Sequence, residues 1–127
     1  MFNMEGIVEF GDWEKLDLRV AEVKDVEAIE GADKLWKISL DVGELGERTI
    51  CAGLKEFYSK DELMGKKISY FFNLASRKMR GIESQGMLLA ASSKDHSAPE
   101  GVPVKGKVVL IRPKNEVRTG EMIVFPK

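Results

Sequence analysis

Three cationic side chains fall within four positions of this sequence. Arg77, Lys78 and Arg80 stand in the stretch RKMRG, between two apolar segments that are typical of strands. Arginine offers a planar fork that grips phosphate at two points or stacks on a base, while lysine is a compact point charge. Their spacing lets a turn spread the charged heads apart, and Gly81 permits a sharp reversal of the chain at positive φ. The turn could therefore bind a phosphate-bearing anion, and the competing interpretation is a solvated surface turn.

The charge of the chain is divided unequally between its two halves. The net charge is only −1, but residues 1–65 hold 8 Lys or Arg against 16 Asp or Glu, and residues 66–127 hold 12 against 5. Within residues 66–80 five side chains are basic and none is acidic. A field of one sign attracts anions and raises their association rate. Chance clustering on a wet surface explains the charge pattern equally well when it is taken alone.

Neutral side chains flank the basic turn. Asn73 and Ser84 could read a ribose hydroxyl or a base edge, or they could cap the backbone of the turn itself. Met79 and Ile82 are expected to be apolar plugs that hold the turn in place. Phe71 is expected on the outward face of its strand, where it could stack on a base or lie in a subunit contact.

Other kinds of site lack the residues they need. Asp95, His96 and Ser97 are consecutive, so their side chains point in different directions and cannot converge as a catalytic triad. One His and one Cys, Cys51, are too few for a zinc site, and no Walker-type or dinucleotide-binding glycine motif is present. We therefore expect no enzyme activity, no metal and no cofactor.

The single cysteine and the hydropathy pattern bear on the compartment. No apolar run approaches the ~20 residues of a membrane span, and no basic region followed by an apolar one begins the chain. A single Cys cannot form an intramolecular disulfide and fits a reducing compartment. We expect a cytoplasmic protein with no membrane partner.

The elements that must hold the basic turn are predicted to be strands with one short helix. Strands are indicated by runs that are rich in β-branched residues or that alternate between apolar and polar positions. A capping box of Ser59 and Glu62 predicts the helix, and Gly65 suits the left-handed position that follows it. The predicted strands cover residues 18–26, 35–42, 48–53, 66–74, 86–92, 107–112 and 121–125.

Local details of these elements follow from the same pattern. Asp12 is the expected N-cap of one helical turn before the first strand. The apolar phase slips within residues 18–26, which predicts a bulge. Residues 86–92 are apolar on both faces, as in a strand buried in the centre of a sheet. The side chains of the fourth strand that are expected to point inward are Ile68, Tyr70, Phe72 and Leu74.

Five short strands with a helix between the third and fourth is the order of an OB-fold barrel. That all-β fold binds oligonucleotides on its strand 2–3 face and with the loops that join strands 1–2 and 4–5, and the basic turn is then the strand 4–5 loop. Small SH3-like barrels also have five strands and are the alternative. We expect one domain over residues 1–127, with a core at about 13–92 and a β-rich C-terminal appendix at 93–127.

Five blocks of the sequence resemble the tRNA-binding OB domain. They are KLDLRVAEV, GADKLWKISLDVG, ERTICAGL, GKKISYFFNL and RKMRGIESQGMLLAAS. This domain occurs in stand-alone bacterial tRNA-binding proteins, at the C-terminus of many methionyl-tRNA synthetases, and in endothelial monocyte-activating polypeptide II. The resemblance runs from about Trp13 to Ser92 and continues more loosely to the end. By motif match it implies tRNA-binding positions at Lys34, Asn73, Arg77, Lys78, Arg80, Ser84 and Met87.

The resemblance also implies how such a protein works. It implies structure-selective binding to the outer corner of tRNA and a homodimer assembled through the appendix, here from Lys105 to Phe125. The chain would act as a stand-alone tRNA-binding homodimer or in trans as the β subunit of methionyl-tRNA synthetase. The alternatives are a subunit that mainly docks on a synthetase complex, and a general binder of single-stranded nucleic acid. One departure is NLAS, where relatives often carry a proline before the basic turn.

RKMRG also resembles, superficially, the lysine-bearing loop of class I aminoacyl-tRNA synthetases. That loop works with an upstream histidine motif and a nucleotide-binding α/β domain. In this sequence the only histidine lies downstream and α/β units are absent, so the resemblance does not support catalysis.

Overall fold

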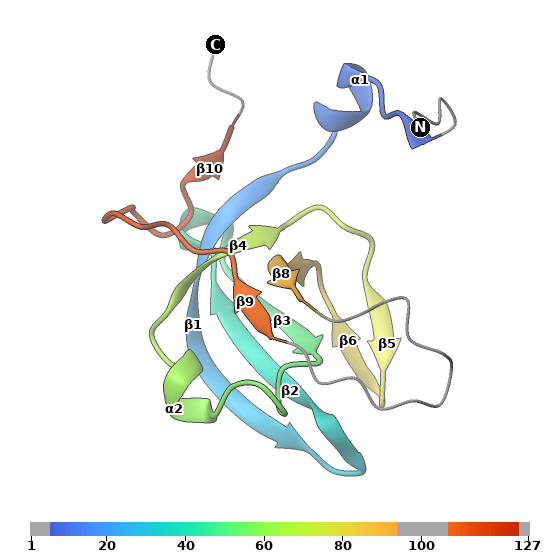
Figure 1. Ribbon diagram of the computed structural model, residues 1–127, viewed down its shortest axis with the longest axis vertical. Coiled ribbons are helices and arrows are strands. Elements are labelled where there is room, and N and C mark those ends of the chain that lie inside the picture. The colour runs from blue at the N-terminus through green and yellow to red at the C-terminus, as the bar shows by residue number, and fades with distance from the viewer. Residues whose placement is uncertain (1–5, 94–106, 125–127) are drawn as a thin grey trace.

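One six-stranded antiparallel sheet forms the centre of the molecule. The computed structural model describes residues 6–93 and 107–124, and within them the sheet order is β3-β2-β1-β4-β7, with β10 paired to β1. Two further antiparallel pairs lie outside this sheet, β5 with β6 and β8 with β9 (Figure 1). The sheet strands are β1 (Leu18–Ile29), β2 (Ala32–Asp41), β3 (Glu47–Ala52), β4 (Lys67–Phe71), β7 (Met87–Leu88) and β10 (Met122–Ile123). The outlying strands are β5 (Arg77–Met79), β6 (Ile82–Ser84), β8 (Ala90–Ser92) and β9 (Val108–Leu110).

The long strand β1 joins the two halves of the sheet. Its first residues pair with β4, and the residues from Glu22 onward pair with β2. The register with β2 shifts between Val23 and Asp25, so the bulge predicted from the slip in apolar phase is confirmed. A bulge bends the strand and increases its twist, which lets one strand serve two partners. A turn at Gly31, at φ +78°, then reverses the chain into β2.

The short helix is the one predicted. Helix α2 (Lys60–Leu63) is N-capped by Ser59, whose Oγ accepts from the backbone N–H of Glu62 at 3.2 Å. The carboxylate of Glu62 accepts from the backbone N–H of Ser59 at 2.9 Å, and these hydrogen bonds lower the pKa of Glu62. Gly65 follows at φ +77°, as expected.

The remaining helical segments are single turns. A 3-10 turn, η2 (Gly43–Leu45), joins β2 and β3. In helix α1 (Phe10–Trp13) the expected N-cap was wrong: Glu9 is the N-cap, and Asp12 lies inside the helix, where its carboxylate is 3.4 Å from Lys15 Nζ. Within the described residues no helix is long and apolar enough to span a membrane.

The core consists mainly of apolar side chains from the sheet strands, as the alternation predicted. The most deeply buried large side chains are Tyr70, Ile38, Leu40, Ile50, Leu63 and Ile68. Phe72 packs against this cluster, but the inward position predicted for Leu74 is wrong, because that side chain is 40% exposed beyond the end of β4. The prediction of one buried strand over residues 86–92 is also wrong. Leu89 divides this segment into β7 and β8, and the side chains of β8 are exposed.

The all-β fold is confirmed, with OB-like strand order and the helix between β3 and β4. The sheet does not close as a barrel through a backbone ladder, because no β3–β7 pairing occurs among the described residues. The two edges meet instead through Gln85. Its backbone N–H donates to the carbonyl of Thr49 at 2.8 Å, and its side-chain oxygen accepts from the N–H of Thr49 at 3.0 Å.

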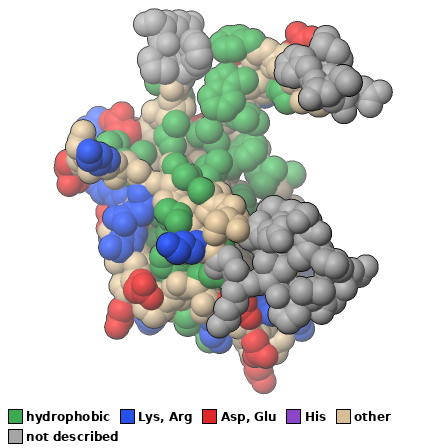
Figure 2. Space-filling model, viewed as in Figure 1, with side chains coloured by type: hydrophobic (Ala, Val, Ile, Leu, Met, Phe, Trp, Pro, Cys, Tyr) green, Lys and Arg blue, Asp and Glu red, His purple; other side chains and the backbone are tan. Residues whose placement is uncertain are grey.

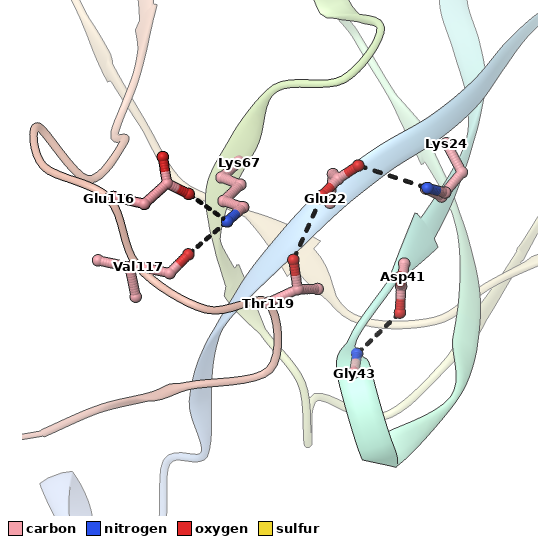
Figure 3. Close-up of polar contacts among 8 residues, drawn as sticks. All are labelled: Glu22, Lys24, Asp41, Gly43, Lys67, Glu116, Val117 and Thr119. Atoms are coloured by element: carbon pink, nitrogen blue, oxygen red, sulfur yellow. Dashed lines mark hydrogen bonds and ion pairs between the residues drawn. The ribbon is translucent and has the colours of Figure 1, made fainter.

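The C-terminal segment is bound across the outside of β1 and β4. Figure 3 shows Lys67 donating to the carboxylate of Glu116 at 2.9 Å and to the carbonyl of Val117, and Thr119 donating to Glu22 at 3.3 Å. The predicted β-strands of the C-terminal appendix are present as β9 and β10. The predicted loop with Asp95, His96 and Ser97 lies outside the described residues.

Gly86 provides a sharp test of how β7 is placed on β4. It has φ +81°, and a Cβ there would lie 2.6 Å from Tyr70 Oη and closer still to the carbonyl oxygen of Phe71. Tyr70 is fully buried, which raises its pKa to about 12, and its hydroxyl donates to the carbonyl of Gln85. We expect Gly86→Ala to lower the free energy of unfolding by about 2–4 kcal/mol, through backbone strain and overpacking.

Urea unfolding measures this change, with Gly53→Ala as the matched control. A Cβ at Gly53 meets nothing within 4 Å, so that variant should stay within about 0.5 kcal/mol of the parent. Equal stabilities of the two variants would contradict the tight contact at Gly86.

Candidate nucleic-acid interface

The basic stretch folds as a two-stranded hairpin that projects beside the sheet (Figure 1). In the β5–β6 pair Lys78 lies opposite Glu83, and Met79 lies opposite Ile82. Arg80 and Gly81 form the two-residue tip at φ +52° and +79°. Two successive positive φ angles are what a type I′ hairpin turn requires. The positive φ predicted for Gly81 is confirmed, and it extends to Arg80.

The apolar side of the hairpin rests on the ends of β1, β2 and β3. Met79 and Ile82 pack against a small cluster formed by Ile29, Ala32 and Cys51. Their expected role as apolar plugs is therefore confirmed. Because opposite residues of a hairpin share a face, this packing turns the Lys78–Glu83 face away from the sheet.

All three cations of the hairpin are exposed and available to an anion. Arg77, Lys78 and Arg80 make no ion pair with any residue that the structure describes. A Cβ on Gly31 would lie 3.8 Å from Arg80 Nη1, which places that guanidinium over the β1–β2 turn. Unpaired charges on a rigid support concentrate positive potential where phosphates can approach.

Lys34 adds a cation on β2, beside the cluster on which the hairpin rests. It is exposed and lies two residues beyond Ala32. Its carbonyl accepts a hydrogen bond from the backbone N–H of Lys55 at 3.3 Å, and the ammonium of Lys55 lies 5.2 Å from the centre of the Trp36 ring. Sequence analysis missed Lys55, because only the fold brings it beside Lys34. A cation held over an aromatic face keeps its charge at a defined place.

Both the oxygen and the nitrogen of the Asn73 side-chain amide form hydrogen bonds with the backbone. Its Oδ1 accepts from the N–H of Asp17 at 2.7 Å, and its Nδ2 donates to the carbonyl of Lys15 at 2.7 Å. This bridge fixes the point where the chain leaves β4 for the hairpin. Of the two interpretations left open for Asn73, the backbone contact is present, and contact with RNA stays a prediction.

Ser84 makes an equivalent contact at the other strand of the hairpin. It is only 4% exposed, and its Oγ accepts from the backbone N–H of Cys51 in β3 at 3.0 Å. Burial raises the pKa of the Cys51 thiol. A side chain this deeply enclosed offers little surface to an RNA, and a direct tRNA contact by Ser84 stays a prediction.

Met87 and Phe71 lie away from the hairpin tip. They face each other across the β4–β7 pair, and both are half-buried. Phe71 is therefore less open than the outward position predicted for it. The tRNA-binding role of Met87 and the stacking or subunit role of Phe71 remain predictions.

The hydrogen bond from Cys51 to Ser84 can be tested by removing the acceptor. Ser84→Ala leaves a buried backbone N–H without a partner, which costs about 1–3 kcal/mol of unfolding free energy. Denaturant unfolding of this variant should be compared with that of Ser76→Ala. The hydroxyl of Ser76 is exposed and reaches only Glu83, at 3.0 Å, so its removal should change stability by less than about 0.5 kcal/mol. Equal decreases in stability would show that Ser84 does not hold the hairpin.

Curated relatives and solved structures agree on what this chain is similar to. It is 44% identical over 112 residues to a methionine–tRNA ligase of Caldanaerobacter subterraneus, and 42% identical over 116 residues to one from Thermococcus onnurineus. These alignments cover 88% and 91% of this chain but only 16% and 14% of the ligases. The chain thus spans a small part of the curated relatives it matches.

The solved structures are matched along nearly their whole length. A methionyl-tRNA synthetase-related protein of Pyrococcus horikoshii superposes with a TM-score of 0.77 at 35% identity, covering 93% of this chain and 98% of that one. The chaperone CsaA of Bacillus anthracis gives 0.75 at 28% identity, covering 94% and 100%. The sequence model of the family described as "Putative tRNA binding domain" matches residues 18–122. This match includes most of the chain and the whole basic hairpin, so the chain belongs to the tRNA-binding domain family.

Proposed function

We propose that the chain binds folded tRNA through the β5–β6 hairpin and does no chemistry on it. The observation that supports this most directly is the set of three exposed cations without an ion-pair partner, held on a hairpin whose apolar side is packed on the sheet. Arg77 and Arg80 can grip phosphate oxygens with planar forks, and Lys78 adds a point charge. Lys34 on β2 and Lys55, which follows β3 and bonds to the Lys34 carbonyl, add two further cations.

Binding should depend on the shape of the RNA more than on its base sequence. Base edges are read by neutral donors and acceptors, while phosphate contacts only position the partner. The neutral groups nearest the hairpin, those of Asn73, Ser84 and Gln85, are engaged with the backbone of this chain. Cations are then the groups left free to contact the RNA, and they detect the spacing of its phosphates.

We further propose that the protein works with methionyl-tRNA synthetase in the cytoplasm, as an accessory subunit in trans. The similarity to short parts of methionine–tRNA ligases supports this role. Docking on the synthetase as the main task is the second candidate. A pull-down with methionyl-tRNA synthetase at low salt separates both roles from stand-alone tRNA binding, and failure to co-elute would count against docking and against the accessory role.

Removing two hairpin charges tests tRNA binding. We expect Lys78→Ala with Arg80→Ala to weaken tRNA binding at least about tenfold, and to reduce the slope of log K against log salt by about 0.7–0.9 for each phosphate that the variant no longer neutralises. Filter binding or fluorescence anisotropy at several salt concentrations measures both quantities. The matched control is Lys15→Ala with Lys24→Ala, which removes the same charge where each lysine pairs with a carboxylate.

Two outcomes would overturn the hairpin as the tRNA site. One is a double variant with unchanged affinity and salt slope, and the other is a control that loses as much affinity as the hairpin variant. Competition by an unstructured oligonucleotide as effective as folded tRNA would favour the general single-stranded binder instead.

We also propose that two copies of the chain associate through an exposed apolar face. Figure 2 shows hydrophobic side chains gathered between α1 and the region of β8 and β9. We assign to this apolar face exposed side chains from these segments and from β10, which are between 36% and 70% exposed: Val8, Trp13, Leu16, Leu89, Val109, Ile111, Met122 and Val124. Contiguous apolar patches of this kind mark interfaces. Helix α1 buries none of its residues within the chain, so it is available to a partner.

Charge placed in the apolar face should prevent this association. We expect Trp13→Glu with Met122→Glu to sediment as a monomer at concentrations where the parent protein is a dimer, because carboxylates resist desolvation. The control is Met64→Glu, which alters a 38% exposed side chain at the end of α2. A parent protein that is itself monomeric, or a charged variant that stays dimeric, would contradict the proposal.

A further inference from the structure

We propose that Lys66, Arg112 and Lys114 form a second cationic surface, which binds phosphates of the RNA backbone. The inference rests on the proposed tRNA binding and adds a contact surface that is separate from the hairpin. In Figure 1 the hairpin lies on one side of the molecule, and α2 and the segment between β9 and β10 lie on the other. An RNA held at both surfaces would be gripped at two distant places.

The backbone of this second surface is firmly positioned. Arg112 follows Ile111, whose carbonyl accepts from the N–H of Ser69 and whose N–H donates to the carbonyl of Leu89. Lys66 precedes β4, and its carbonyl accepts from the N–H of Val23 at 2.9 Å. The cations thus extend from segments tied into the sheet.

Two neighbouring hollows meet at Arg112. One, of about 230 Å³, is lined by Arg112 and Lys66 together with the acidic side chain of Glu62. The other, of about 320 Å³, is lined by Arg112 and Lys114 together with Lys67 and Glu116. A guanidinium between two hollows can offer its planar fork to an oxyanion in either of them. The surface is therefore continuous from Lys66 to Lys114.

The surface has a net positive charge, because four cations line the two hollows and only two carboxylates, those of Glu62 and Glu116, do so. Glu116 pairs with Lys67 at 2.9 Å, and Glu121 pairs with Arg118 at 3.2 Å. The carboxylate of Glu62 accepts a hydrogen bond from the backbone N–H of Ser59 at 2.9 Å. Among the described residues none forms an ion pair with Lys66, Arg112 or Lys114. The exposed charges of Arg112 and Lys114, which have no ion-pair partner in the described part of the chain, present a site for an anion.

The position of the surface suits a long polyanion. Figure 2 shows Lys and Arg side chains gathered beside the apolar face, over the segment that joins β9 and β10. An RNA backbone carries phosphates along its whole length, so one molecule can contact both the hairpin and the second surface. An acidic protein surface is the competing occupant.

Removing the two exposed charges of the second surface tests the inference. We expect Arg112→Ala with Lys114→Ala to weaken tRNA binding about three- to tenfold at low salt, and to reduce the salt slope by about 0.7–0.9 for each phosphate left without its cation. The exchange Arg112→Lys with Lys114→Arg keeps both charges and should restore most of the affinity and the slope. Lys15→Ala with Lys24→Ala controls for the change in net charge, because both lysines pair with carboxylates.

The outcomes separate this inference from the proposed function. If the hairpin variant loses affinity and the Arg112 and Lys114 variant keeps both affinity and slope, the second surface does not bind RNA, and an acidic protein partner is favoured. Two other results would overturn the inference. One is a decrease in affinity that the charge-preserving exchange does not restore, and the other is a decrease that sedimentation shows to come from dissociation of the dimer. If the parent protein does not bind tRNA, both the proposed function and this inference fail.

Discussion

The packing of the β5–β6 hairpin on the ends of β1, β2 and β3 is the constraint on which the positive surface depends. A lone two-stranded hairpin is marginally stable in water. Here Met79 and Ile82 cover the cluster around Cys51, and the N–H of Cys51 donates to Ser84. These contacts hold one face of the hairpin on the sheet, and the opposite face presents the exposed pair Lys78 and Glu83. The backbone that carries the cations is thereby held against the sheet.

The same contacts explain why charge dominates the interface. The polar groups beside the hairpin complete the fold: Asn73 joins the end of β4 to the chain before β1, and Gln85 joins the two edges of the open sheet. An OB-like sheet that lacks a closing backbone ladder needs such side-chain bonds to hold β3 near β7. Groups engaged in this way cannot also read base edges without breaking a bond that stabilises the fold.

The C-terminal segment connects the interface to assembly. It is bound to β1 and β4 through Lys67 and Thr119, and it places Ile111 and Met122 in the apolar face. The same segment carries Arg112 and Lys114, so association of two copies and a second contact with RNA would depend on one stretch of chain. The close approach of Gly120 to Val42, where a Cβ would lie 2.9 Å from a backbone oxygen, keeps this stretch against the sheet.

Local patterns in the sequence were enough to predict much of the fold. The capping box at Ser59, the bulge in β1, the alternation of β2 and the turn at Gly81 were all predicted, because each depends on residues close together in the chain. The apolar pattern was misleading where pairing between distant strands decides which residues are buried. Residues 86–92 look like a buried strand, but Gly86 turns sharply against Tyr70, and Leu89 separates β7 from an exposed β8. At Leu74 the strand has already ended, so alternation no longer determines burial.

The candidate site divides in the same way. By itself the sequence determined that a cationic turn stands between two strands, that it has apolar plugs, and that the chain resembles a tRNA-binding domain. Only the tertiary structure decided that the turn is a hairpin resting on β3, that Asn73 and Ser84 bind backbone, and that Lys55 lies beside Lys34. The physical reason is the range of the interactions. Charge, turn chemistry and strand period act between neighbours in the chain, whereas these hydrogen bonds and packing contacts join residues that only the folded sheet brings together.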